Sequence, residues 1–154
     1  MSFDEVALIE AGENGSVFGD NSFFDYVITE ASKDGGVSWF PLVDGYDNRA
    51  NSSWAAAYNS AIDEQNNSNA VGDESLFANR QINLLENVNI QPNDEILIRF
   101  RLFADQLAHG WGWAIDNLKI QIDDERPSIV HNHIDFVSTL DDIEISARVT
   151  DTPA

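Results

Sequence analysis

A regular alternation of apolar and polar side chains over residues 95–103 constrains the fold of this chain more than any other feature. The apolar residues of one face are Ile96, Ile98, Phe100 and Leu102. Side chains alternate between the two faces of an extended strand, so this pattern predicts a β-strand with its apolar face in the core. The sequence shows no helical period of useful length and no internal repeat. We therefore expect an all-β fold, with an antiparallel β-sandwich as the most economical architecture.

Shorter extended segments are expected at residues 6–9, 24–30 and 81–85. The first is an apolar run, and the second alternates so that its aromatic and aliphatic residues share one face. The chain enters its first strand within a few residues, without the basic and apolar regions of a signal peptide. We therefore expect one or more opening strands, and a signal peptide, upstream of this sequence.

A change of phase marks the strand expected after residue 112. Trp113 and Ile115 fall on one face of an extended segment, whereas Leu118 and Ile120 fall on the other. One extra residue in a strand reverses the phase of every side chain that follows it. The sequence therefore predicts a bulge at residues 116–117, and we expect the apolar residues on both sides of it to lie in the core.

The charge of the chain excludes several classes of function. Among 154 residues, Lys and Arg total 8 against 27 Asp and Glu, which gives a formal net charge of -19. Such a charge repels nucleic-acid phosphates and anionic lipid, so we expect no nucleic-acid partner. No apolar run approaches the roughly 18 residues that span a bilayer, so we expect no membrane insertion. In so acidic a chain, Arg99 and Arg101 pair with carboxylates of neighbouring strands or, alternatively, clamp an anionic ligand.

The chain contains no cysteine, which removes disulfides, thiolate metal ligands and cysteine catalysis. Metalloprotease helices of the His-Glu-x-x-His type, Gly-x-Ser-x-Gly elbows and phosphate-binding glycine loops are also absent from the sequence. We therefore expect a protein that is not an enzyme.

Residues 44–79 are rich in Asn, Ser, Gly and Asp, which predicts a long excursion from the sandwich. A short helix is expected at residues 54–58, with Ser52 or Ser53 as its cap. Three aromatic residues in the excursion are candidates for ligand binding: Tyr46, Trp54 and Tyr58. Two roles are open for them, an exposed surface on which a sugar ring stacks and an anchor that pins the excursion to the sandwich.

The pattern changes after Pro127. Residues 127–154 contain two strand-like stretches, at 129–137 and 143–149, and are too few to bury a core of their own. We expect them to begin a second, truncated β-domain of the immunoglobulin or fibronectin kind.

Residues 32–39 fit the Asp-box signature of a β-hairpin. The positions that carry the signature are Ser32, Asp34, Gly36 and Trp39. The carboxylate accepts turn N–H groups, glycine permits a left-handed residue, and the aromatic ring packs beneath the turn. The segment predicts a hairpin, with the next strand beginning at residue 37.

A second motif joins the Asp-box to indicate a family. The strand at residues 99–105 is followed by Gly-Trp-Gly-Trp-Ala-Ile-Asp-Asn at residues 110–117. Together, residues 3–122 resemble the jelly-roll modules of the MAM-like and reelin-subrepeat kind. Similar modules accompany secreted bacterial metallopeptidases of the immune-inhibitor-A type and occur in large bacterial surface proteins. The resemblance implies an antiparallel jelly-roll β-sandwich over residues 1–126.

Modules of this kind often hold a structural calcium ion near the sheet edge. Carried onto this sequence, the resemblance implies a calcium site formed by Glu10, Asp25 and Asp116. Ca²⁺ takes six to eight oxygen ligands in irregular geometry, which suits carboxylates from separate strands. Many relatives carry a second Asp where this chain has Asn117. A second role is open for Asp116, because its carboxylate can pin the expected bulge through a backbone N–H.

The resemblance also implies a function. We expect a non-catalytic accessory, adhesive or spacer module of a larger secreted or cell-surface bacterial protein. Its partners are neighbouring domains of the same polypeptide and extracellular protein or glycan. The alternative is an accessory domain that an adjacent secreted metallopeptidase or glycosidase requires.

Overall fold

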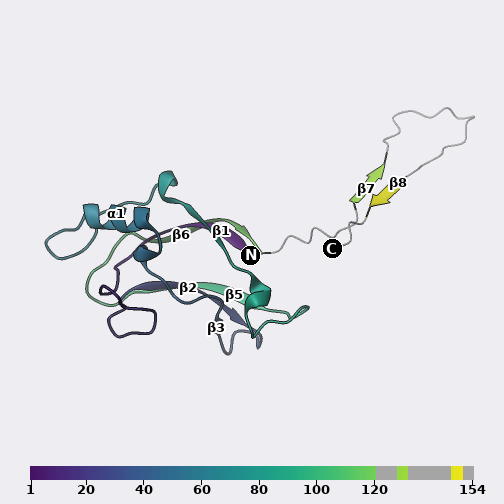
Figure 1. Cartoon of the computed structure of the whole chain (residues 1–154), viewed down its shortest axis with the longest axis horizontal. Coiled ribbons are helices and arrows are strands. Elements are labelled where there is room, and N and C mark those ends of the chain that lie inside the picture. The colour runs from purple at the N-terminus through teal and green to yellow at the C-terminus, as the bar shows by residue number, and fades with distance from the viewer. Residues whose placement is uncertain (121–127, 132–146, 151–154) are drawn as a thin grey trace, which may run out of the picture. The chain divides into compact units, whose positions relative to one another are not determined.

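The computed structural model describes residues 1–120, 128–131 and 147–150, and the chain divides into two compact units, residues 1–120 and 121–154 (Figure 1). Most regular structure of the larger unit is β. Its elements are β1 (Ser2–Leu8), β2 (Tyr26–Ser32), β3 (Phe40–Pro41), η1 (Asn48–Ala50), α1 (Ser52–Ser60), η2 (Glu74–Leu76), β4 (Ala78–Gln81), η3 (Leu84–Glu86), β5 (Leu97–Phe103) and β6 (Gly112–Lys119). In the smaller unit, β7 (Ser128–His131) pairs antiparallel with β8 (Ala147–Thr150).

The larger unit contains two antiparallel sheets of three strands, in the orders β4-β1-β6 and β3-β2-β5. Aromatic contacts join the inner faces of the two sheets. The Phe100 ring of β5 lies edge-on to Phe3 of β1 and to Trp113 of β6, with centroids 5.2 Å and 5.7 Å apart. The all-β class is therefore confirmed, and the two sheets pack as a sandwich.

The central strands β1 and β2 contribute half of the buried apolar residues in the described part of the chain, because each has a strand on both sides. Phe100 packs against this core as its alternation predicts. Leu102 of the same face is 41% exposed, because it lies near the end of an edge strand. Ile120 is 49% exposed and follows the last residue of β6. Leu118 of β6 is 44% exposed as well, so the expectation that these three residues are buried is wrong.

The bulge in β6 is confirmed. Ser2 pairs with Lys119 and Asp4 pairs with Asp116, so β6 contains one more residue than β1 between these pairs. Asn117 takes up the extra residue with φ at 52°. Asparagine tolerates this left-handed conformation better than most residues do. The change of phase in the apolar pattern of residues 113–120 therefore results from the bulge.

The long excursion is ordered and holds α1, which begins earlier than expected. Asn51 caps the helix, since its side chain accepts the backbone N–H of Ser53 at 2.8 Å. Trp54 and Tyr58 are buried, and the indole N–H of Trp54 donates to the carbonyl of Leu76 at 2.7 Å. These rings pin the excursion to the sandwich. The alternative of an exposed stacking surface is wrong for both residues.

The strand expected at 6–9 is β1, which begins earlier, at Ser2, and the strand expected at 24–30 is β2 at Tyr26–Ser32. Two other expected strands differ more. The segment expected at 81–85 divides into β4 and η3, because the Asn83 side chain accepts the N–H of Leu85 and starts a helical turn. The strand expected from residue 37 begins at Phe40, where β3 pairs with Ala31 of β2. The hairpin turn occupies the residues between.

A buried carboxylate lies between the sheets. Glu5 is 1% exposed, and its Oε2 accepts hydrogen bonds from the Tyr46 hydroxyl (2.7 Å) and the Trp113 indole N–H (2.8 Å). Arg80 pairs with Oε1 of Glu5 and lies over the Tyr46 ring, 3.9 Å from its centroid. A charge in the core requires such partners. Tyr46 therefore acts as an anchor, and burial raises the pKa of its hydroxyl.

The C-terminal strands expected at 129–137 and 143–149 lie partly outside the described residues. Within the described residues, β7 and β8 form a two-stranded antiparallel pair. No helix in the described residues is long and apolar enough to cross a membrane.

Candidate metal centre

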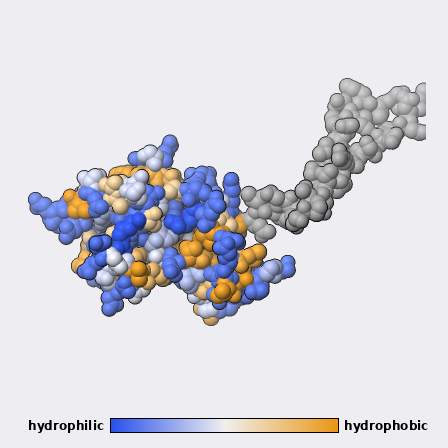
Figure 2. Space-filling model, in the orientation of Figure 1, coloured by the Kyte–Doolittle hydropathy of each residue, from blue (hydrophilic) through white to orange (hydrophobic). Residues whose placement is uncertain are grey.

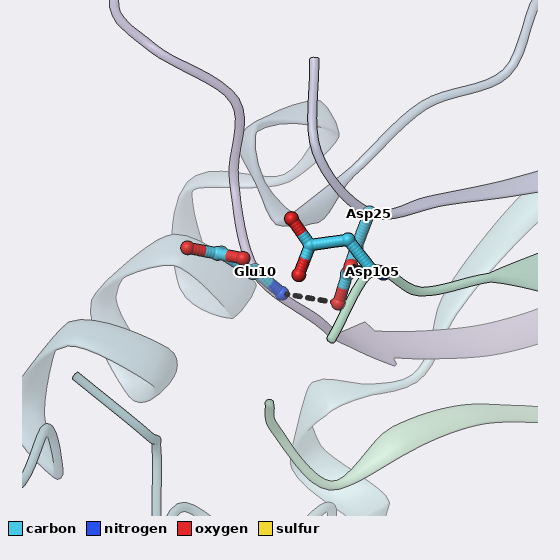
Figure 3. A group of neighbouring side chains, drawn as sticks. All are labelled: Glu10, Asp25 and Asp105. Carbon is cyan, nitrogen blue, oxygen red and sulfur yellow. Dashed lines mark hydrogen bonds between the residues drawn. The ribbon is translucent and has the colours of Figure 1, made fainter. Parts of the chain in front are cut away.

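Three carboxylates from different connections meet at one end of the sandwich (Figure 3). Glu10 follows β1, Asp25 precedes β2, and Asp105 follows β5. One oxygen of each carboxylate lies within 4.8 Å of one oxygen of both others. We call these three residues the acidic cluster. Because β1 belongs to one sheet and the other two strands to the second sheet, the cluster connects both layers.

Asp25 organises the acidic cluster. Its Oδ2 accepts the backbone N–H of Glu10 at 3.4 Å, and its Oδ1 accepts the backbone N–H of Asp105 at 3.0 Å. Only 2% of Asp25 is exposed. One buried side chain therefore holds the backbone at the other two positions.

The acidic cluster contains more oxygens than hydrogen-bond donors. Oε2 of Glu10 is buried and has no hydrogen-bond partner among the described residues. Burial, followed by the charges of Asp105 and Asp25, raises the pKa of Glu10 to about 7. Burial also raises the pKa of Asp25, although backbone hydrogen bonds from Asp105 and Glu10 partly oppose the shift. A cation would relieve the desolvation and the repulsion together.

Tyr58 and Gly110 lie close to the acidic cluster and to the end of β1. Burial, then the charges of Glu10 and Asp25, raise the pKa of Tyr58 to about 12. The Tyr58 hydroxyl donates to the carbonyl of His109 at 3.5 Å. A Cβ at Gly110 would lie 2.3 Å from the Leu8 carbonyl oxygen and 2.8 Å from the Tyr58 ring. Glycine is therefore required where this loop approaches β1.

The donor set of the acidic cluster suits a hard cation. Three carboxylates offer oxygen alone, and Ca²⁺ completes its six to eight ligands with carbonyl groups and water. Transition metals favour sites that contain imidazole or thiolate. A calcium ion here would draw together the connections after β1, before β2 and after β5.

The structure brings together two of the three residues expected to bind calcium. Glu10 and Asp25 belong to the acidic cluster, and Asp116 does not, because it pairs with Asp4 near the start of β1. The Asp116 carboxylate accepts the backbone N–H of Asn117 at 2.7 Å, which fits its alternative role at the bulge. The third carboxylate of the acidic cluster is Asp105. Sequence reasoning missed it, although it stands two residues after the strongest strand pattern.

The hairpin at residues 32–39 forms around Asp34. The Asp34 carboxylate accepts the Ser38 N–H through both oxygens (2.9 Å and 3.0 Å) and the Ser38 hydroxyl at 2.6 Å. Ser32 donates its hydroxyl to the same carboxylate at 2.8 Å. Gly36 has φ at 92°, and its carbonyl accepts the Trp39 indole N–H at 3.0 Å. Hydrogen bonds from Ser38 and then Ser32 lower the pKa of Asp34 to about 2.

Arg99 and Arg101 both pair with Glu30 on the neighbouring strand. The two Nε atoms lie 2.8 Å and 2.9 Å from Glu30 Oε2. Hydrogen bonds from Arg101 and Arg99 lower the pKa of Glu30, against its burial. The prediction of carboxylate partners on a neighbouring strand is confirmed.

Comparisons with protein-family models, with curated proteins and with solved structures find no match to this chain. The fold and the site therefore define its class on their own: an all-β protein with two antiparallel sheets and an acidic candidate metal centre.

Proposed function

We propose that residues 1–120 form a non-catalytic β-sandwich module stabilised by calcium. The observation that carries the proposal is the buried Oε2 of Glu10, which has no hydrogen-bond partner among the residues that the structure describes and lies beside the carboxylates of Asp25 and Asp105. The residues that would hold the ion come from connections of both sheets. Calcium would supply the positive charge that these oxygens lack, and the chain itself positions them through Asp25.

We further propose a jelly-roll topology and membership of a larger secreted or cell-surface bacterial protein. Support comes from the Asp-box and from the Gly-Trp-Gly-Trp-Ala-Ile-Asp-Asn segment, which resemble MAM-like and reelin-subrepeat modules. The separate β7–β8 pair supports the proposal that a second β-domain follows the first, near residue 127. Neighbouring domains of the same polypeptide are then the first partners of the module.

Among the roles open to such a module, positioning neighbouring domains fits best. Trp54 and Tyr58 are buried, and Tyr46 is bound to Glu5, so these rings offer no platform for sugar stacking. Binding of extracellular protein or glycan would need another surface. The second candidate is an accessory domain for an adjacent secreted metallopeptidase or glycosidase, which the resemblance suggests.

Thermal unfolding of the full chain tests the calcium proposal. Calcium at about a hundred times its Kd adds about 2.7 kcal/mol of stability, because a ligand that binds only the folded state shifts the equilibrium. For a domain of this size, we expect the Tm to rise by roughly 8 °C. Asp105→Asn should reduce this rise by more than half.

Asp116→Asn is the matched control, because it removes the same charge from a strand of the same sandwich. It should keep the full calcium response. An unchanged Tm in millimolar calcium would contradict the proposal. Loss of the response in Asp116→Asn, with retention in Asp105→Asn, would show that the ligand set is wrong.

A further inference from the structure

Both strands at one side of the sandwich have a single neighbour within the described residues. β5 pairs with β2, and β6 pairs with β1, whereas the other two edges are the short strands β3 and β4. The open strands contain seven and eight residues, so each presents a long row of backbone groups. Proteins usually block such edges with short strands, proline, charge or β-bulges. The bulge of β6 lies after Asp116, and residues 112–116 keep a regular register. β5 contains no proline, and its two arginines are paired with Glu30.

The two open edges lie on the same side, because Phe100 of β5 contacts Trp113 of β6 across the sandwich. Apolar surface is exposed among the polar regions of the larger unit, in orange (Figure 2). The exposed apolar residues on or beside the two open strands are Leu97, Leu102, Phe103, Trp111, Leu118 and Ile120. A long apolar edge of this kind favours the addition of another strand.

The two open strands run in opposite directions. Asp105 of the acidic cluster follows the end of β5, and Gly112 at the start of β6 pairs with Leu8 near the same cluster. A two-fold axis parallel to the strands preserves strand direction. Such an axis therefore places β5 of one copy antiparallel to β6 of a second copy, with the inner faces of both strands on the same side.

Aromatic contacts set the register of this pairing. Phe100 contacts Phe3 on one side and Trp113 on the other, at centroid distances of 5.2 Å and 5.7 Å. Ile115 lies between these two positions along the β1–β6 pair. These contacts place Phe100 near the level of Ile115. The two-fold axis would then place Phe100 opposite the partner's Ile115. Apolar inner-face residues then face each other across the pairing.

Charge complementarity favours the same arrangement. One residue earlier in β5, Arg99 would lie opposite the partner's Asp116. The side chain of Asp116 is exposed. Arg99 bonds Glu30 through Nε at 2.8 Å, and its Cζ lies 4.1 Å from the centroid of the Trp39 ring. Its terminal nitrogens have no partner in the part of the chain that the structure describes. Pairing β5 with β5 would instead set Arg99 against the partner's Arg101, which like charges disfavour.

We propose that the chain binds a second copy of itself through this open side, with β5 of each copy paired to β6 of the other. Each sheet then continues through three strands of one copy into three strands of the other. The two-fold symmetry closes the assembly and leaves neither long edge open. This inference is independent of calcium binding.

Analytical ultracentrifugation of the full chain tests the proposal. In about 0.15 M salt, which screens the repulsion between acidic copies, we expect the mass of a dimer at micromolar concentration. Asp116→Lys should weaken self-association by at least about tenfold, because it places a lysine opposite the partner's Arg99. Glu64→Lys is the matched control: it lies in an exposed turn and changes the net charge equally, from -19 to -17. It should leave the dimer intact.

Cysteine cross-linking tests the register, because the chain has no cysteine of its own. A mixture of Arg99→Cys and Asp116→Cys should form disulfide-linked pairs that contain one copy of each variant. Such a dimer has a second, symmetry-related contact, which keeps the native residues Arg99 and Asp116. A monomer at every concentration, equal association of Asp116→Lys and Glu64→Lys, or cross-links only within each single variant would overturn the proposal. A monomer would leave the open side to a strand from another protein.

Discussion

The two ends of strand β2 place aspartates in opposite environments. Before the strand, Asp25 is buried beside Glu10 and Asp105, and the pKa of Glu10 is raised to about 7, chiefly by burial. After the strand, Asp34 accepts the hydroxyl and the backbone N–H of Ser38, and these bonds lower its pKa to about 2. One end of β2 therefore carries a carboxylate with several hydrogen-bond donors, and the other end carries a group of carboxylates with few.

This contrast shows how the surroundings decide the role of a carboxylate. The hairpin supplies donors from its own residues, so Asp34 stabilises the turn without any ligand. In the acidic cluster, two backbone N–H groups donate to Asp25, whereas Oε2 of Glu10 has no hydrogen-bond partner in the described part of the chain. A cation would satisfy the cluster, whereas the hairpin has no need of one.

We expect the largest loss of stability from Asp25→Ala, at the end of β2 that holds the acidic cluster. This change leaves the N–H groups of Glu10 and Asp105 without their acceptor in a buried site, and we expect a loss of about 3 kcal/mol in the free energy of unfolding. Urea unfolding in the absence of calcium measures it. Asp25→Asn keeps an acceptor oxygen and should lose less. Equal stability of Asp25→Ala and the parent chain would contradict the organising role of Asp25.

A smaller loss is expected at the hairpin end. Asp34→Ala removes the acceptor of the Ser38 N–H, and we expect the Tm to fall by a few degrees, with or without calcium. Asp44→Ala is the control, because Asp44 is exposed and has no side-chain hydrogen bond among the described residues. If Asp34→Ala unfolds at the same temperature as Asp44→Ala, the turn does not depend on its carboxylate.

The smallest effect is a pH dependence of opposite sign at the two ends. In the calcium-free protein, folded Glu10 holds its proton more tightly than unfolded Glu10 does, because its pKa is raised from 4.5 to about 7. Its contribution to stability therefore falls as pH rises through this window. The pKa of Asp34 is lowered from 3.8 to about 2, so its contribution is lost as pH falls through that window.

Urea unfolding across the pH range separates these two contributions. Glu10→Gln should flatten the profile of stability between about pH 4.5 and 7 and leave the acid limb unchanged. Asp34→Asn should do the reverse. If Glu10→Gln has the same profile as the parent chain, burial does not perturb Glu10 in the folded protein.

Features that depend on a few adjacent residues were predictable from the sequence. The bulge at residues 116–117 followed from the phase of the flanking apolar residues, and the hairpin followed from the spacing of Ser32, Asp34, Gly36 and Trp39. Both features are set by local backbone conformation and by side chains within a few positions. Their physical causes are therefore contained in a short segment.

Features that depend on contacts between distant segments could not be predicted from the sequence. Asp105 joins the acidic cluster through Asp25, which lies 80 residues away in the chain. No spacing in the sequence encodes that contact, and the family resemblance implied Asp116 as the third ligand. Alternation likewise identifies the inner face of β5 without showing that β5 is an edge strand. The exposure of Leu102 follows from its place in the sheet.

Calorimetric titration of the calcium-free full chain with calcium, at a pH of about 8 where Glu10 is ionised, tests the central claim most directly. We expect one ion bound per chain in the parent and in Asp116→Asn, and a Kd raised at least about tenfold in Asp105→Asn. No heat of binding in millimolar calcium, or equal affinity in Asp105→Asn and the parent chain, would contradict it.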